Sequence, residues 1–335
     1  MRTVLRTQQC SHTFELVAAV DVDPKKARRD VGELLGLDED TGITIERDAE
    51  EALHRTRPDV VLHTTTSFLE DVYPQIEGCI RHGAHVISST EELAFPFERH
   101  KNRSQALDDL AREHGVAVVG TGVNPGYAMD LLPLMATAVC TDVRSVHVQR
   151  IVNAGSRRMP LQQKIGAGLN VDAFAERKST GRFGHIGLRE SLSLLAAGLG
   201  WVIERIDEHL EPVIAEQDVQ TDHLRVGRGE VAGIHHTMKG FHGTAEVLSL
   251  DLLMYVGATD SRDVIRIDGT PPINLVVQNG IFGDTATVAM VVNTIPAIVQ
   301  AAAGLRTMMD LPVPRAVASA LVDQQRSAAE RGHFG

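Results

Sequence analysis

The 335-residue sequence is poor in several features, and each absence excludes a class of protein. Its only cysteines, Cys10, Cys79 and Cys140, are far apart and have no CxxC spacing, which argues against a disulfide framework and a zinc site. The formal net charge is -11 and the basic clusters are short, so no stripe of cations is available to neutralise nucleic-acid phosphates. We therefore expect neither a metal site nor a nucleic-acid partner.

We expect neither a secretion signal nor a membrane-spanning segment in this sequence. Its first ten residues have no long apolar core of the kind found in secretion signals. The most apolar stretch, Thr285 to Leu305, contains Asn293, Pro296 and Gln300, which suits a buried helix better than a membrane span. Together with the cysteine usage, this predicts a cytoplasmic protein without a membrane partner.

The first 122 residues alternate short β-rich runs with amphipathic helical stretches. With 43% hydrophobic and 23% charged residues in the whole chain, this rhythm predicts a folded α/β protein with a Rossmann-like, doubly wound parallel sheet. The expected strands are 14–20, 42–45, 59–65, 84–88 and 116–120, and the expected helices between them are 68–82 and 98–114.

The pattern of hydrophobic and polar residues changes after Pro125. We expect a helix of about fifteen residues there, because a proline fits the first turn of a helix. Partial alternation between residues 144 and 277 then predicts an α+β substrate domain with a mostly antiparallel sheet. Gly283-Asp284-Thr285 is expected to cap a long helix from Ala286 to about Ala303. The predicted division is a dinucleotide-binding domain (1–124, with the helical segment 284–314 packing back on it) and a substrate and dimerisation domain (125–283).

The strand 14–20 ends at Asp21, and a carboxylate at the end of a second strand normally binds the ribose hydroxyls of a nicotinamide cofactor. The glycine-rich turn for the pyrophosphate should lie about 20 residues upstream, but no glycine precedes Gly32. We expect the first strand and this turn to be missing, with Met1 an internal start and the complete protein extending about 15 to 25 residues further; genuine loss of the turn is the alternative. Asp21 favours NAD, whereas Lys25 and Lys26 still admit NADP.

A dense polar run, Ser88-Ser89-Thr90-Glu91-Glu92, follows a predicted parallel strand. Polar residues at such strand ends face the ligand crevice of an open α/β sheet. Ser89 and Glu92 have the spacing of a capping box, which gives Glu92 a structural explanation and leaves Glu91 without one. We predict a functional role for Glu91 and keep Glu92 as a candidate residue of the substrate pocket.

A second strand-turn-helix pattern contains Gly122, Asn124, Pro125 and Gly126. Its third glycine comes one position too late for a dinucleotide fingerprint, so it is a poor phosphate cradle. It suits a tight turn that places Asn124, Pro125 and Gly126 in the pocket and the Gly122 backbone beside the cofactor. An ordinary turn before a helix remains the alternative.

A third strand end carries Thr64, Thr65, Thr66 and Ser67. Thr64, Thr65 and Ser67 are candidates to line the ribose edge of a nucleotide, and plain capping of the next helix by Thr66 or Ser67 is the alternative.

His235-His236 invites a metal interpretation, but neighbouring residues of a strand point to opposite faces and cannot share one ion.

These motifs, in this order and spacing, resemble the dihydrodipicolinate reductase-like family, and within it the 2,4-diaminopentanoate dehydrogenases and native amine dehydrogenases. The matching segments are 17–21, 89–93, 120–126 and 283–286. The resemblance implies an NAD(P)-dependent oxidoreductase that interconverts a small amine or diamine and a ketone through an imine. It places the family's catalytic carboxylate at Glu91 and implies a homodimer. The chemistry agrees, since an ammonium group must lose a proton before its carbon can give up hydride.

The chain departs from dihydrodipicolinate reductase itself. The His-His-x-x-x-Lys cluster of that enzyme is absent, and the corresponding stretch is 150–158, so a diacid substrate is disfavoured. Two other functions stay open. One is an imine or dihydrodipicolinate-type reductase of amino-acid metabolism, and the other is a non-catalytic relative that lost its cofactor turn.

Overall fold

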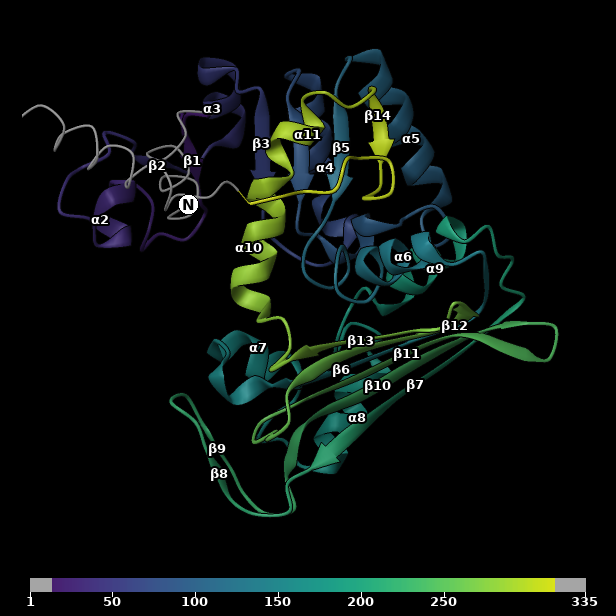
Figure 1. Cartoon of the computed structure of the whole chain (residues 1–335). Coiled ribbons are helices and arrows are strands. Elements are labelled where there is room, and N and C mark those ends of the chain that lie inside the picture. Colours follow the sequence, from purple (N-terminus) through teal and green to yellow (C-terminus); the bar gives the residue numbers. More distant parts are fainter. Residues whose placement is uncertain (1–13, 317–335) are drawn as a thin grey trace, which may run out of the picture.

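The computed structural model describes residues 14–316 (Figure 1). Within that range no helix is long and apolar enough to cross a membrane. Its α-helices are α2 (Val31–Leu35), α3 (Ala49–Thr56), α4 (Leu69–Arg81), α5 (Lys101–Glu113), α6 (Leu131–Ala136), α7 (Met159–Lys164), α8 (Val171–Ser179), α9 (Leu188–Gly198), α10 (Gly283–Asn293) and α11 (Ile295–Ile298). Short 3-10 helices are η1 (Glu91–Ala94), η2 (Thr137–Val139) and η3 (Ala154–Ser156). The strands are β1 (Ala19–Val20), β2 (Ile45–Glu46), β3 (Val60–His63), β4 (His85–Ser88), β5 (Ala117–Gly120), β6 (Asp142–Asn153), β7 (Arg205–Ile214), β8 (Val219–Gln220), β9 (Arg225–Val226), β10 (Val231–His242), β11 (Ala245–Tyr255), β12 (Arg262–Thr270), β13 (Ile273–Gln278) and β14 (Gly304–Arg306).

The first lobe is built on a parallel sheet with the strand order β14-β5-β4-β3. Apolar side chains cover both of its faces. One cluster includes α4 and α5 residues such as Ile76 and Leu107, and the other includes Met290 and Val291 of α10. Burial on both faces explains why the strands around Val86 and Val118 are apolar without alternation. The predicted parallel α/β architecture is confirmed.

The front of the chain forms a separate two-stranded parallel sheet of β1 and β2. The expected strand 14–20 was too long, because only Ala19 and Val20 pair with a neighbour. Val17 and Val20 are 41% and 42% exposed, so this segment lacks the packing that would extend the ladder. Among the described residues no strand joins β1 to β3, and the two sheets stand apart (Figure 1).

The second lobe is built on a six-stranded sheet with the order β13-β12-β6-β11-β10-β7. Its pairs are antiparallel except for β6 and β11, so the predicted mostly antiparallel sheet is confirmed. α9 packs on β10 and β11 and buries Leu192 and Leu195 against them. The helices α7, α8 and α9 were not predicted.

The fifteen-residue helix expected after Pro125 is wrong. Turns fill residues 124–130, and the helical part consists of α6 and the short η2. Gly126 has φ +121°, a conformation outside the right-handed helix, and its N–H donates to the Asp130 carboxylate over 2.7 Å. Asp130 also accepts from the Leu131 N–H, so the true helix start lies there.

The long C-terminal helix also differs from the expectation. It starts at Gly283 with Phe282 at the N-cap, and it ends at Asn293 instead of Ala303. Pro296 has no N–H and its ring crowds the preceding turn, so the chain restarts as the short α11. α10 nevertheless runs from the second sheet back to the first, as Figure 1 shows.

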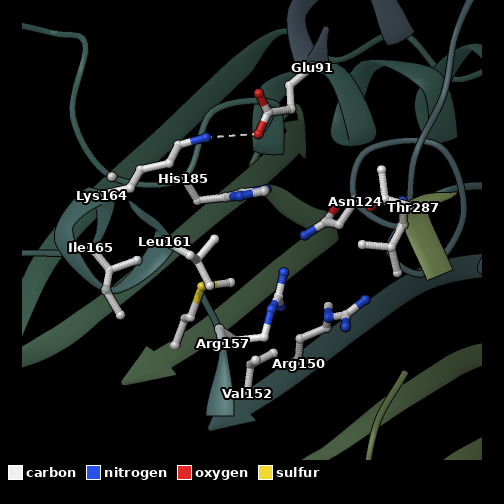
Figure 2. A pocket seen from close by; sticks show the side chains of 13 residues that line it. Glu91, Asn124, Arg150, Val152, Arg157, Leu161, Lys164, Ile165, His185 and Thr287 are labelled. Atoms are coloured by element: carbon white, nitrogen blue, oxygen red, sulfur yellow. Dashed lines mark hydrogen bonds and ion pairs between the residues drawn. The ribbon is translucent and has the colours of Figure 1, made fainter. Parts of the chain in front are cut away.

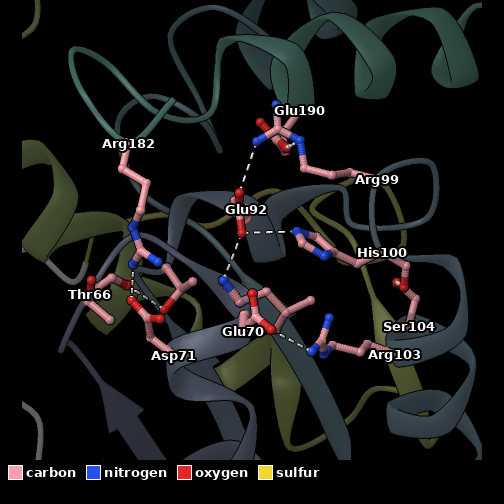
Figure 3. Close-up of polar contacts among 12 residues, drawn as sticks. Thr66, Glu70, Asp71, Glu92, Arg99, His100, Arg103, Ser104, Arg182 and Glu190 are labelled. Carbon is pink, nitrogen blue, oxygen red and sulfur yellow. Dashed lines mark hydrogen bonds and ion pairs between the residues drawn. The ribbon is translucent and has the colours of Figure 1, made fainter. Parts of the chain in front are cut away.

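A buried polar cluster joins the two lobes (Figure 3). Glu92 accepts hydrogen bonds from the Leu69 N–H (2.8 Å), Arg99 (2.9 Å) and His100 (2.9 Å). Arg99 lies 3.6 Å from Glu190 of α9 in the other lobe. The predicted capping box is therefore wrong, because Glu92 satisfies the first turn of α4 and η1 has no side-chain cap.

Glu190 makes the stability of the fold depend on pH. Burial raises the pKa of Glu190 from 4.5 to about 7, Arg99 opposes the rise and nearby Glu92 adds to it. Between pH 4.5 and 7 the unfolded chain releases this proton while the folded chain retains it, so the free energy of unfolding falls as the pH rises through that window.

We predict that Glu190→Gln removes this loss. The effect of the substitution on the free energy of unfolding should be more favourable at pH 8 than at pH 4.5 by about 3 kcal/mol. Urea unfolding at both pH values measures the change. Glu70→Gln, at a side chain 66% exposed, is the control and should leave the pH dependence as it is. A Glu190→Gln protein with the wild-type pH dependence contradicts the prediction.

Candidate active site

Polar loops gather at the carboxyl ends of β3, β4 and β5. Backbone hydrogen bonds hold these loops in register, from the Ser89 N–H to the His63 carbonyl and from the Thr121 N–H to the Ser88 carbonyl. Because parallel strands end at one edge of the sheet, the loops after all three strands face the second lobe together.

A cavity of about 100 Å³ lies where the loops meet the second lobe (Figure 2). A water-sized group needs roughly 10–15 Å³, so the space holds a small molecule on the order of ten heavy atoms or fewer. Both lobes line it, with the residues Glu91, Val123, Asn124, Arg150, Val152, Arg157, Leu161, Lys164, Ile165, Gly184, His185, Met254 and Thr287.

Glu91 stands at the first position of η1, directly after the loop that follows β4. Its Oε1 lies 2.9 Å from Nζ of Lys164, which belongs to α7 of the other lobe. The same ammonium donates to Ser67 Oγ over 3.2 Å. The side chains of Glu91 and Lys164 are 20% and 32% exposed, so this ion pair is largely shielded from water at the pocket wall.

The Asn124 loop forms a second wall. Asn124 Nδ2 donates to Met129 Sδ over 3.2 Å, and its Oδ1 accepts from Ser191 Oγ at 3.4 Å. Ser191 also donates to Asp130 over 2.7 Å. Burial raises the pKa of Asp130, while its bonds to the Gly126 N–H and Ser191 favour the ionised form. The loop is thus fixed from behind by buried hydrogen bonds, and Asn124 faces the cavity.

Two arginines form a cationic side of the pocket, away from the Glu91–Lys164 pair (Figure 2). Arg150 of β6 lies 3.2 Å from Asp263 and donates to the Ile281 carbonyl at 2.7 Å. Arg157 donates to Asp284 of α10 at 3.0 Å. Nη1 of Arg150 and Nε of Arg157 are buried and have no hydrogen-bond partner among residues 14–316. Buried donors without partners are costly, so these atoms suit an anionic group of a ligand.

His185 is a neutral wall of the same pocket. Burial lowers its pKa well below 6.5, and the charges of Lys164, His236, Arg150 and Arg157 lower it further. Its Nε2 is buried without a hydrogen-bond partner in the described part of the chain. A neutral imidazole can accept or donate one hydrogen bond to a ligand without adding charge.

The remaining predicted residues lie behind or outside the pocket. Pro125, Gly126 and Gly122 are buried behind Asn124, and Ser67 reaches the pocket only through Lys164. Glu92 points away from the cavity into the buried cluster between the lobes (Figure 3).

Asp21, Thr64 and Thr65 do not line the cavity. Carboxylates and hydroxyls can bond ribose hydroxyls, and this role of the three residues stays a prediction. The Asp21 carboxylate accepts from the Asp23 N–H at 2.9 Å and pairs with Lys26 at 2.5 Å, and the Lys26 bond lowers its pKa. The hydroxyl-bearing residues Thr64 and Thr65 are exposed just after β3. Between Phe14 and Val31 no glycine is present to hold a pyrophosphate.

Sequence reasoning missed Arg150, Arg157, Lys164, His185 and Thr287. Arg150 is a buried residue of β6, a strand with ordinary alternation of buried and less buried residues. Lys164 is the last residue of the short helix α7, whose sequence contains no recognisable motif. Arg150 and Arg157 both lie in the stretch 150–158 that the family comparison had marked, but nothing in that stretch pointed to either side chain. Their role depends on how the lobes meet.

Together, the doubly wound parallel sheet, the mixed second sheet and the pocket between them are typical of two-lobed oxidoreductases. Residues 127–327 match the 2,4-diaminopentanoate dehydrogenase C-terminal domain. The chain is 34% identical over 277 residues to 2,4-diaminopentanoate dehydrogenase of Acetoanaerobium sticklandii, which covers 80% of this chain and 78% of that protein. The chain therefore belongs to the 2,4-diaminopentanoate dehydrogenase family, and the resemblance seen in the sequence is confirmed.

Two further relatives agree with this membership. An amine dehydrogenase of Streptomyces virginiae is 23% identical over 344 residues and covers 94% of both chains. The solved structure of an amine dehydrogenase from Mycobacterium smegmatis superposes with a TM-score of 0.85 at 24% identity, over 95% of this chain and 94% of that one. The second match shows that the two chains share their fold.

Gly187 lies where the two lobes approach each other closely. Gly187 has φ +101°, and a Cβ there would overlap the Pro125 ring and lie 3.0 Å from Glu91 Cβ. We expect Gly187→Ala to destabilise the fold by about 2–4 kcal/mol, through backbone strain plus the clash. Gly181→Ala, at a positive-φ glycine with open space around it, should cost about 1 kcal/mol. Thermal unfolding compares the two, and equal losses contradict the clash.

Proposed function

We propose that this protein catalyses the NAD(P)-dependent interconversion of a small amine and its ketone, with a carboxylate-bearing amine as the preferred substrate. One observation carries the proposal: the same small pocket holds a carboxylate, Glu91, and two buried guanidinium groups with free N–H donors, Arg150 and Arg157. Glu91 suits an ammonium group, and the arginines suit a carboxylate. The family membership supports the reaction class.

Each of the pocket residues has its own role in the proposed reaction. Arg150 and Arg157 bind and orient the anionic end of the substrate. Glu91 holds the substrate ammonium and removes its proton, since only the free amine can be oxidised. Asn124 and neutral His185 flank the reacting carbon without competing charge. Asp21, Thr64 and Thr65 would hold the riboses of a nicotinamide cofactor, which would supply the hydride acceptor for the reaction.

The wider organisation belongs to the proposal as well. We propose that residues 1–124 with segment 284–314 bind the cofactor, and that residues 125–283 bind substrate and form a homodimer. The support is the family resemblance and the separate apolar cores of the two sheets. We further propose that the enzyme acts in the cytoplasm.

Glu91→Gln tests the reaction. The amide keeps the shape of the side chain but is a poor proton acceptor, so we expect the rate of amine oxidation to fall by about 10²- to 10⁴-fold. Formation of reduced cofactor from a panel of short amines measures it. The control is Glu70→Gln, at the exposed Glu70–Arg103 pair, which should not change the rate. Equal rates in the wild type and Glu91→Gln would remove Glu91 from the mechanism.

Arg157→Met tests the anionic end of the substrate. The change leaves Asp284 with Arg158 at 3.4 Å, so the fold keeps a counter-charge there. We expect kcat/KM for an aminoalkanoic acid to fall about 10- to 100-fold, as the loss of a charged hydrogen bond implies, and kcat/KM for the plain amine of equal length to stay within about twofold.

Arg158→Met is the matched control. Arg158 also contacts Asp284, but its side chain is 79% exposed and does not line the cavity. Its kcat/KM should stay near wild type for both substrates. If Arg157→Met lowers activity toward acid and amine alike, Arg157 supports the fold of the site and does not select the substrate.

A further inference from the structure

Lys164 has no part in the steps above, although it makes the closest polar contact of Glu91 in the pocket. Its Nζ lies 2.9 Å from Glu91 Oε1 and 3.2 Å from Ser67 Oγ (Figure 2). A residue that only stabilised the fold could do so on the surface, whereas this one places its ammonium at the cavity wall. Its position therefore calls for a chemical explanation.

The backbone under Lys164 is held firmly. Gln162 of the same helix is fully buried, and its Nε2 donates to the Gly155 and Arg157 carbonyls at 3.2 and 2.8 Å. Its Oε1 accepts from Thr221 Oγ1 at 3.0 Å. α7 is thus anchored on its inner side, and Lys164 extends from its last position toward Glu91.

Lys164 is also the one lining side chain, among those the structure describes, that can donate a proton as a cation and then take one back. Arg150 and Arg157 do not give up their protons in such exchanges. His185 is neutral, because burial holds its pKa well below 6.5. The other lining residues besides Glu91 are apolar, glycine, Asn124 or Thr287.

The proposed reaction requires such a group, since Glu91 alone cannot serve both the nitrogen and the oxygen of the substrate. We propose that Lys164 is a second acid–base residue, which carries the proton to and from the substrate oxygen when ketone and imine interconvert. This inference rests on the proposed function.

The protons balance in the ketone-to-imine direction. Glu91 takes a proton from ammonium, and the ammonia adds to the carbonyl carbon, forming the C–N bond. Lys164 protonates the carbonyl oxygen and regains a proton from the newly bonded nitrogen. Lys164 then protonates the hydroxyl, the C–O bond breaks, and water leaves. The protonated Glu91 returns its proton to Lys164 across their 2.9 Å contact. The sum is ketone plus ammonium giving iminium plus water, with both side chains restored.

Oxygen exchange isolates this step from redox chemistry. 4-Oxopentanoate labelled with ¹⁸O at the ketone is incubated with the full chain, ammonium and oxidised cofactor, so that imine can form and hydrolyse but cannot be reduced. Loss of label to water, followed by mass spectrometry, measures the interconversion. We expect the wild type to accelerate it in proportion to ammonium, and Lys164→Met to lower it about 100-fold.

Two further variants separate proton transfer from charge and from folding. Lys164→Arg keeps a cation beside Glu91 but cannot cycle a proton, so it should lose exchange as Lys164→Met does while melting at the wild-type temperature. Lys178→Met, at an exposed lysine of the neighbouring helix α8, should exchange label like the wild type.

Normal exchange in Lys164→Met, or full exchange in Lys164→Arg, overturns the role of Lys164 and leaves the proposed function intact. Amine oxidation by the wild type without any catalysed exchange overturns it as well, because the imine would then hydrolyse away from the protein. If the wild type neither oxidises amines nor exchanges oxygen, the proposed function itself fails.

Discussion

The close approach of the second lobe to the strand ends of the first is the constraint on which the site depends. Gly187 touches Pro125 and the base of Glu91, and only a residue without a side chain fits there. Ser191, one turn into α9, then reaches Asp130 and Asn124. α7 of the same lobe places its lysine beside Glu91.

The charges of the pocket are arranged so that each one has a use or a partner. Glu91 is paired with Lys164 while the pocket is free of substrate, and Arg150 and Arg157 each hold one acidic partner and keep one donor free. Buried charges without compensation are costly, so under the proposed function a ligand with an ammonium and a carboxylate would satisfy both ends of the pocket at once.

Local sequence patterns failed where a distant contact decided the conformation. The segment after Pro125 has helical composition, but the Asp130 side chain binds the Gly126 N–H and holds the chain in turns. Glu92 has capping-box spacing, yet it satisfies the start of α4, more than twenty residues earlier in the chain. In both cases a buried carboxylate bonds to a backbone group that the local motif does not include.

The sequence alone determined the parallel sheet, the mostly antiparallel second sheet, the family, and the positions of Glu91 and Asn124 after strands. Continuous apolar runs indicate strands that are buried on both faces. Polar residues directly after such strands indicate the edge of the sheet at which parallel strands end. Both patterns span only a few neighbouring residues, so they can be recognised in the sequence. Only the tertiary structure brought Lys164, His185, Arg150 and Arg157 to that edge. These side chains come from the second lobe, and their meeting with Glu91 depends on a contact between residues about 75 to 95 positions apart, for which no local spacing exists.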